Sequence, residues 1–230
     1  MKIIIRLVLL LLVLSCSNKQ SDLIVKANIK GLKKGTVYLK KLVDSTLVTV
    51  DSVIVNGNSN IELTSDLESP DLFYLDLDKN SAENERITFF ADKGTTNINT
   101  TLKQFVFDAD IQGSEQQKIW AQYQLLMSRL NNRNLDIIKE SFDAAIGGDS
   151  LAKENYNNKY NSLVKARYLQ TVNFALQHKD SEVAPYLAVT QIYDARKKYL
   201  DTIYNTLTAN MQDSKYGKRL KGLIDSRTEE

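Results

Sequence analysis

Apolar and polar residues alternate with a period of two in the first half of the chain. Turn signals such as Asn56-Gly57-Asn58 and Lys93-Gly94 separate the alternating segments. Eight strands are predicted, over residues 23–29, 36–43, 46–55, 61–63, 73–77, 87–91, 95–102 and 105–111. Short strands at this spacing predict an antiparallel β-sandwich or a curled β-meander.

The period becomes helical after Gly113. Ser114 and Gln117 form a capping-box pattern, which predicts a helix that runs to Gly147-Gly148. Further helices are predicted over residues 150–178, from the N-cap Ser181 onward, around 200–207 and over 214–227. The pattern therefore predicts an α+β chain, with a β-rich domain over residues 23–113 and a helical region over residues 114–230.

The first fifteen residues have the pattern of a signal peptide. Lys2 and Arg6 are basic, and residues 7–14 are an unbroken apolar run. As a helix this run would extend about 12 Å, whereas a hydrocarbon core is about 30 Å thick. We therefore expect residues 1–15 to be removed rather than to span a membrane.

The apolar run ends in Ser15-Cys16, which resembles a bacterial lipobox. Cleavage would fall between these two residues, and the Cys16 sulfur would take the diacylglyceryl group. Residues 16–22 would then be the lipidated cysteine and a polar tether, and the membrane would be a partner of the chain through that lipid. The alternative is an ordinary signal peptide that a cysteine follows by chance.

The charge and the cysteine content of the chain argue against several classes of function. Loss of Lys2 and Arg6 leaves 28 basic and 28 acidic side chains, which argues against nucleic acid as a partner. Residues 17–115 carry a net charge of −4 and residues 116–230 a net charge of +4, which favours two structural units. Because Cys16 is the one cysteine, no disulfide or thiolate metal site is expected.

Several sequence features resemble a known family. They lie at 29–31 (Ile-Lys-Gly), 35–39 (Gly-Thr-Val-Tyr-Leu), 89–94 (Phe-Phe-Ala-Asp-Lys-Gly) and 111–114 (Ile-Gln-Gly-Ser). The chain resembles the domain-of-unknown-function 4369 family, which forms the N-terminal domain of many Bacteroidetes thiol:disulfide interchange lipoproteins. In those proteins a thioredoxin-like domain follows. This chain has no Trp-Cys-x-x-Cys motif, so their redox activity is not carried over to any residue here.

The resemblance and the lipobox together indicate a lipid-anchored protein of the bacterial cell envelope. The segment from Ser17 to Asp22 lacks the acidic run that often marks surface-exported lipoproteins of that phylum. We therefore expect the periplasmic face of the outer membrane.

The sequence offers no catalytic or metal-binding constellation, and no cofactor is expected. His178 is the single histidine, near a predicted helix end, where a solvated role is favoured. The segment from Asp76 to Asn80 begins like a calcium loop, but Ser81 and Ile87 replace the required glycine and glutamate. A paired-carboxylate site stays open, since separation in sequence does not give separation in space.

The leading interpretation is a non-enzymatic, membrane-anchored binding or accessory module. One alternative is an accessory subunit of a thiol-redox or oxidative-stress system that acts with a separate thioredoxin-like protein, and another is a hydrolase with an unrecognised carboxylate site. A binding surface is expected where the two units meet. Trp120 and Tyr123 are the aromatic candidates to line it, and the alternative is that they form the core joining the halves.

Overall fold

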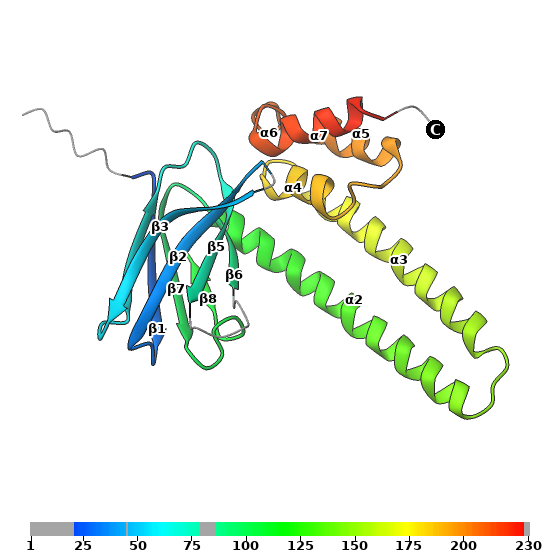
Figure 1. Cartoon of the computed structure of the whole chain (residues 1–230). Coiled ribbons are helices and arrows are strands. Elements are labelled where there is room, and N and C mark those ends of the chain that lie inside the picture. The colour runs from blue at the N-terminus through cyan, green and yellow to red at the C-terminus, as the bar shows by residue number, and fades with distance from the viewer. Residues whose placement is uncertain (1–20, 45, 79–85, 228–230) are drawn as a thin grey trace, which may run out of the picture.

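The computed structural model describes residues 21–44, 46–78 and 86–227. Two four-stranded sheets fill its N-terminal half (Figure 1). The strands are β1 (Leu23–Lys30), β2 (Lys34–Val43), β3 (Thr46–Asn56), β4 (Asn60–Ser65), β5 (Asp71–Asp78), β6 (Arg86–Ala91), β7 (Gly94–Thr101) and β8 (Asp110–Gln112). Sheet A has the order β4-β1-β7-β8 and sheet B the order β3-β2-β5-β6.

The inner faces of the two sheets share one apolar core. Alternate residues of the strands point into it, among them Val25 and Ile98 from sheet A and Leu75 and Phe89 from sheet B. This confirms the predicted β-sandwich. The pairing is antiparallel except between β1 and β7, which run parallel. The prediction of a wholly antiparallel arrangement is therefore wrong at this pair, because period-two alternation specifies a strand's buried face and not its neighbour.

The predicted strand over residues 105–111 is mostly a turn. Only Asp110–Gln112 pair with β7, and residues 102–108 form bends and turns. Phe105 is buried in the sandwich core, and its carbonyl accepts a hydrogen bond of 2.7 Å from the Thr100 hydroxyl. The apolar side chain at position 105 thus comes from a turn that closes one end of the core.

Helices form the rest of the described chain. They are α2 (Glu115–Ile146), α3 (Ala152–Gln177), α4 (Val183–Thr190), α5 (Lys197–Thr206), α6 (Ala209–Gln212) and α7 (Lys215–Asp225). Helix α2 begins as predicted, with the Ser114 hydroxyl accepting from the Gln117 backbone N–H at 3.0 Å. Helices α2 and α3 form a long antiparallel hairpin that projects away from the sandwich (Figure 1). The predicted change from strands to helices near Ser114 is confirmed.

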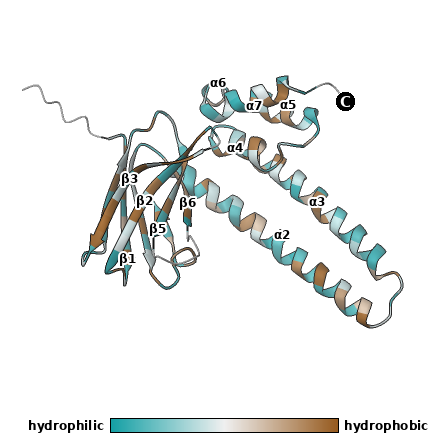
Figure 2. Ribbon diagram, viewed as in Figure 1, coloured by the Kyte–Doolittle hydropathy of each residue, from teal (hydrophilic) through white to brown (hydrophobic). Residues whose placement is uncertain are grey.

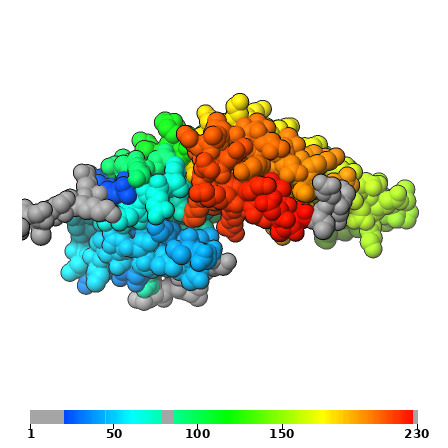
Figure 3. Space-filling model, turned by 90° about the horizontal axis from the view of Figure 1, so that it is seen from above, coloured from blue at the N-terminus to red at the C-terminus, as the bar shows by residue number. Residues whose placement is uncertain are grey.

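A second apolar core joins the two halves. Leu72 and Phe90 lie on the outer face of sheet B and pack against residues of α2, α4 and α7. The Phe90 ring meets Trp120 and Tyr186 edge-on, with centroids 5.9 and 5.1 Å apart. Figure 2 shows the alternation of hydrophobic and hydrophilic residues along the elements, and Figure 3 shows the C-terminal helices lying against the sandwich while the hairpin tip extends beyond them.

None of the helices in the described ranges combines the length and the apolar character that crossing a bilayer requires.

Candidate functional site

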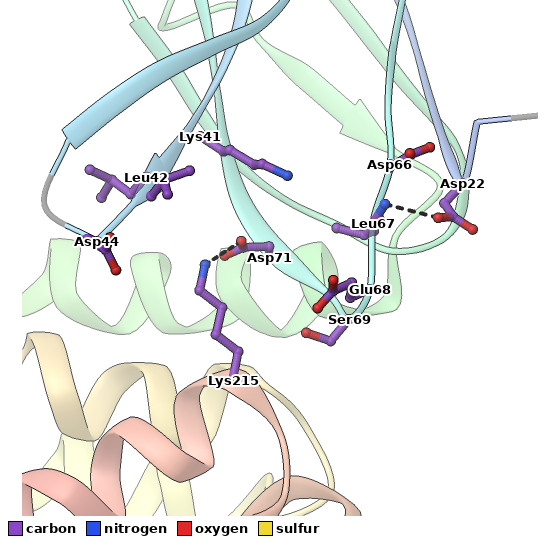
Figure 4. A pocket seen from close by; sticks show the side chains of 11 residues that line it. Asp22, Lys41, Leu42, Asp44, Asp66, Leu67, Glu68, Ser69, Asp71 and Lys215 are labelled. Carbon is purple, nitrogen blue, oxygen red and sulfur yellow. Dashed lines mark hydrogen bonds and ion pairs between the residues drawn. The ribbon is translucent and has the colours of Figure 1, made fainter.

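An open pocket of about 490 Å³ lies where the sandwich meets helix α7 (Figure 4). We call it the junction pocket. Its wall comes from the start of β1, the end of β2, the loop between β4 and β5, and the first residue of α7. The lining residues are Asp22, Lys41, Leu42, Val43, Asp44, Asp66, Leu67, Glu68, Ser69, Asp71 and Lys215.

Local contacts fix the sandwich side of this pocket. The Asp22 carboxylate accepts a hydrogen bond of 3.1 Å from the Leu67 backbone N–H, and Lys93 pairs with the same carboxylate at 3.1 Å. Leu67 itself is buried in the sandwich core. The loop between β4 and β5 is therefore held against the beginning of β1, where the chain enters the fold.

Asp71 connects the pocket to the helical region. Its Oδ2 atom lies 2.5 Å from Lys215 Nζ, and the Tyr216 hydroxyl donates to Oδ1 at 2.5 Å. Burial and the nearby Asp71 carboxylate both raise the pKa of Tyr216, so the phenol keeps its proton and remains a donor. Asp71 is 8% exposed, and its carboxylate is thus paired with one ammonium and one phenol at the boundary of the two units.

A second carboxylate lies behind this contact, inside the helical region. Glu182 is 1% exposed, and its Oε2 atom is 2.8 Å from the Ser214 hydroxyl, which is also the N-cap of α7. Burial raises the pKa of Glu182 to about 7, and the Asp71 carboxylate adds to the rise. Its other oxygen has no hydrogen-bond partner among the described residues. Glu182 is not part of the pocket wall.

The wall of the junction pocket has an excess of negative charge. It contains five carboxylates and two lysines; Lys215 is paired with Asp71, and Lys93, which lies outside the wall, is paired with Asp22. Asp44 and Glu68 are exposed side chains on opposite sides of the opening. An ammonium or guanidinium group is therefore the chemical class that this wall fits best.

The structure places the two aromatic candidates in the core and not in this pocket. Trp120 is 8% exposed and Tyr123 is 2% exposed, and their rings stack with centroids 5.8 Å apart. The Tyr123 hydroxyl lies 3.0 Å from Thr171 Oγ1 of α3. Both rings are largely buried, which favours the core over a binding surface for these two residues. They belong to the core that joins the halves, since α2 must bury its apolar stripe there.

Other sequence candidates lie elsewhere. The cleavage and lipidation residues, Ser15 and Cys16, lie outside the described residues, as do 79–85 of the segment that resembles a calcium loop. Asp76, at the start of that segment, pairs with Arg86 at 2.6 Å and Lys40 at 2.8 Å. Burial alone would raise the Asp76 pKa, but the hydrogen bonds from Arg86 and Lys40 lower it.

His178 lies against the Phe174 ring at the end of α3, with centroids 4.4 Å apart. In the described ranges, no three histidine, cysteine, aspartate or glutamate side chains are grouped to hold a metal ion.

Sequence reasoning placed a site at the junction but missed the residues that form it. Asp71 and Lys215 are 144 positions apart, and neither belongs to a motif. Pro70 before β5 and Ser214 before α7 mark the two element starts at which they lie, and those are the only local signals.

Comparisons with curated proteins and solved structures do not indicate a function for the chain. No curated protein matches the chain. Transthyretin from Sparus aurata is 12% identical and is matched over 42% of this chain and 100% of its own, with a TM-score of 0.32. Sea bream transthyretin in complex with thyroxine is 10% identical over 41% of this chain and 97% of its own, with a TM-score of 0.31. These TM-scores are too low to support an argument about function.

The family match covers the sandwich and the first residues of α2. It extends over residues 23–120, from the first residue of β1 to Trp120. The matched unit therefore includes the helical turn that packs on β6 as well as the two sheets. Residues 23–120 match the model of the family described as domain of unknown function DUF4369.

Proposed function

We propose that this protein is a non-enzymatic, lipid-anchored binding module of the cell envelope, and that it holds a positively charged group of a partner in the junction pocket. The contact between Asp71 and Lys215 carries the proposal. It shows an ammonium group seated at this wall, at 2.5 Å from a carboxylate that is largely buried. Asp44 and Glu68, which are exposed at the opening, would offer carboxylates to a lysine or arginine of a partner.

The anchor and the pocket would be close together. Cys16 is six positions before Asp22, which lines the pocket. A fully extended chain spans at most about 3.3–3.6 Å per residue, so the pocket would lie within roughly 20 Å of the lipid. The site would therefore face partners at or near the membrane surface, on the periplasmic face of the outer membrane.

Asp71 and Glu182, the two largely buried carboxylates near the junction, are not arranged as a hydrolytic pair. A carboxylate pair that cleaves a bond must face a space in which a substrate fits. Asp71 reaches the pocket, but Glu182 is 1% exposed and lies outside the pocket wall. Asp71 is also already paired with Lys215 and Tyr216. These contacts support a structural and recognition role for Asp71.

A calorimetric titration with a tetralysine peptide tests the proposed site. The full chain in detergent should bind the peptide at low ionic strength and release it as salt is raised. The double variant Asp44→Asn/Glu68→Gln should bind about tenfold more weakly, equivalent to about 1.4 kcal/mol.

The matched control is Asp136→Asn/Glu154→Gln, which makes the same change in net charge on the exposed hairpin far from the pocket. Equal binding by both double variants, or no binding by the unaltered protein, would rule out the junction pocket as the site.

A further inference from the structure

The outer face of sheet A is hollowed and lined by side-chain amides. The hollow has a volume of about 610 Å³ and lies over β1, β4, β7 and β8. We call the five carboxamide residues there the amide face: Asn28, Asn60, Asn97, Asn99 and Gln112. All five side chains are exposed. This face is on the opposite side of sheet A from the sandwich core and is separate from the junction pocket.

The strand register places these amides in rows across the sheet. Asn28 pairs with Asn60 on one side and with Asn99 on the other, so three asparagines stand side by side on β4, β1 and β7. In the next row, Asn97 pairs with Gln112 of β8 and with Lys26 of β1. Neighbouring strands are about 4.8 Å apart, so a carboxamide recurs at that interval across the face.

A solvent-facing strand position calls for a polar side chain, but not for asparagine in particular. Asparagine is depleted in strands, since its side chain competes with the backbone for hydrogen bonds. Within the described ranges, the side chains of Asn28, Asn97 and Asn99 make no hydrogen bond to another residue. In contrast, Gln112 donates to the Asp110 carboxylate at 2.8 Å. The three asparagines therefore present both a donor and an acceptor to whatever lies over the sheet.

The lining of the hollow has no net charge, and the Asp110 carboxylate at its β8 edge is already bonded by Gln112, so a neutral ligand fits it best. Its wall contains one cation and one anion, Lys26 and Glu62, which lie 3.9 Å apart and offset each other. The backbone groups of β1 and β7 are used in the ladders on both of their sides, so the ligand meets side chains and not a free strand edge. An added peptide strand, which needs such an edge, does not fit this face.

We propose that the amide face binds a neutral oligosaccharide. A carboxamide can donate to one hydroxyl of a vicinal pair and accept from the other, and a row of amides repeats that pairing along a chain of sugar rings. The ligand lies across the strands, along the row of Asn60, Asn28 and Asn99, and reaches Asn97 and Gln112 at its flank.

Titration with three tetrasaccharides tests the proposal: chitotetraose, cellotetraose and maltotetraose. The full chain is purified in a detergent without a sugar headgroup, because such a headgroup would compete. At millimolar concentrations at least one of the three should bind with saturation. The variant Asn28→Val/Asn99→Val should lose that binding by about tenfold or more, since it removes two amides that each bond the ligand. Valine favours strands, so the variant should stay folded, which its urea unfolding midpoint checks.

The matched control is Asn157→Ala/Asn158→Ala, which removes two exposed amides from helix α3 and should bind like the unaltered protein. Binding should also persist in Asp44→Asn/Glu68→Gln, which separates this site from the junction pocket. No saturable binding of any of the three tetrasaccharides, or undiminished binding by the valine variant, would overturn the proposal.

Discussion

Gln117 Oε1 accepts a hydrogen bond of 2.9 Å from the backbone N–H of Phe90. Phe90 lies on β6, the edge strand of sheet B, and its N–H would otherwise point away from the sheet without a partner. In a full capping box the Gln117 side chain would accept a hydrogen bond from the backbone N–H of the N-cap Ser114. Here it accepts from strand β6 instead. The first turn of α2 thus covers the open edge of the sandwich and fixes where the helical region begins.

Replacing Gln117 by alanine should therefore destabilise the protein. A buried N–H that loses its acceptor costs about 1–3 kcal/mol. Urea unfolding measures the loss, and hydrogen exchange at the Phe90 amide should become faster. Gln117→Glu keeps an acceptor oxygen and should leave that amide better protected than alanine does. An unchanged exchange rate at Phe90 in the alanine variant would contradict this role.

Trp120→Ala should cost about 3–5 kcal/mol, the usual range for a buried large aromatic. Trp120 is 8% exposed and contacts Phe90, Tyr123 and Tyr186. Phe142→Ala on the projecting hairpin is the matched control, because Phe142 is 65% exposed and its loss should change stability by less than about 0.5 kcal/mol. Both values come from urea unfolding at constant pH. Similar losses for the two variants would argue against a core role of Trp120.

Glu182 should make stability depend on pH. Its folded-state pKa of about 7 lies above its ordinary value of 4.5, so the folded state binds the proton more tightly than the unfolded state does. Stability should therefore fall as pH rises from about 4.5 to 7, with the full loss present above pH 7. The loss is at most about 3 kcal/mol, at 1.36 kcal/mol per pKa unit.

The variant Glu182→Gln should flatten this dependence and be more stable than the unaltered protein above pH 7. Urea unfolding at pH values between 5 and 8 is the measurement, and Glu154→Gln on the exposed hairpin should leave the pH profile unchanged. A glutamine variant with the same pH profile as the unaltered protein would show that another group titrates in this window.

Cells that express the chain with labelled palmitate should incorporate label at Cys16. Two or three acyl chains at this position would hold the protein at the membrane, since each buried CH₂ contributes about 0.8 kcal/mol. Cys16→Ser should abolish the label and leave an uncleaved precursor. Label that persists in the serine variant, or its absence from the unaltered chain, would refute lipidation at this residue.

Local patterns predict the elements well, because their signals are local. The turn at Asn56-Gly57, the cap at Ser114 and the stop at Gly147-Gly148 each depend on a few adjacent residues, and the structure has an element boundary at each. Which strands pair and which side chains meet across the fold is not encoded by adjacent residues. The parallel pairing of β1 with β7 and the contact of Asp71 with Lys215 join segments far apart in sequence.

The sequence also does not tell which apolar side chains the protein buries itself. A helical stripe that contains Trp120 and Tyr123 predicts a face that needs covering, but it does not say whether the protein itself or a partner provides the cover. For the amide face, the sequence indicates which residues are exposed but not that they lie together. Asn97 and Asn99 alternate with buried residues in the sequence, yet only the register of β4, β1 and β7 brings Asn60, Asn28 and Asn99 into one row.

The central position of β1 determines how the domain responds to mechanical tension at its N-terminal end. β1 is hydrogen-bonded to β4 on one side and to β7 on the other along nearly its whole length. A pull on the residues before Leu23 acts along the strand, so both ladders are loaded in shear and their bonds share the force. An edge strand pulled from its end across the sheet would instead open one bond at a time. Anchoring at Cys16, as proposed above, would thus load the domain through a strand that is paired on both sides.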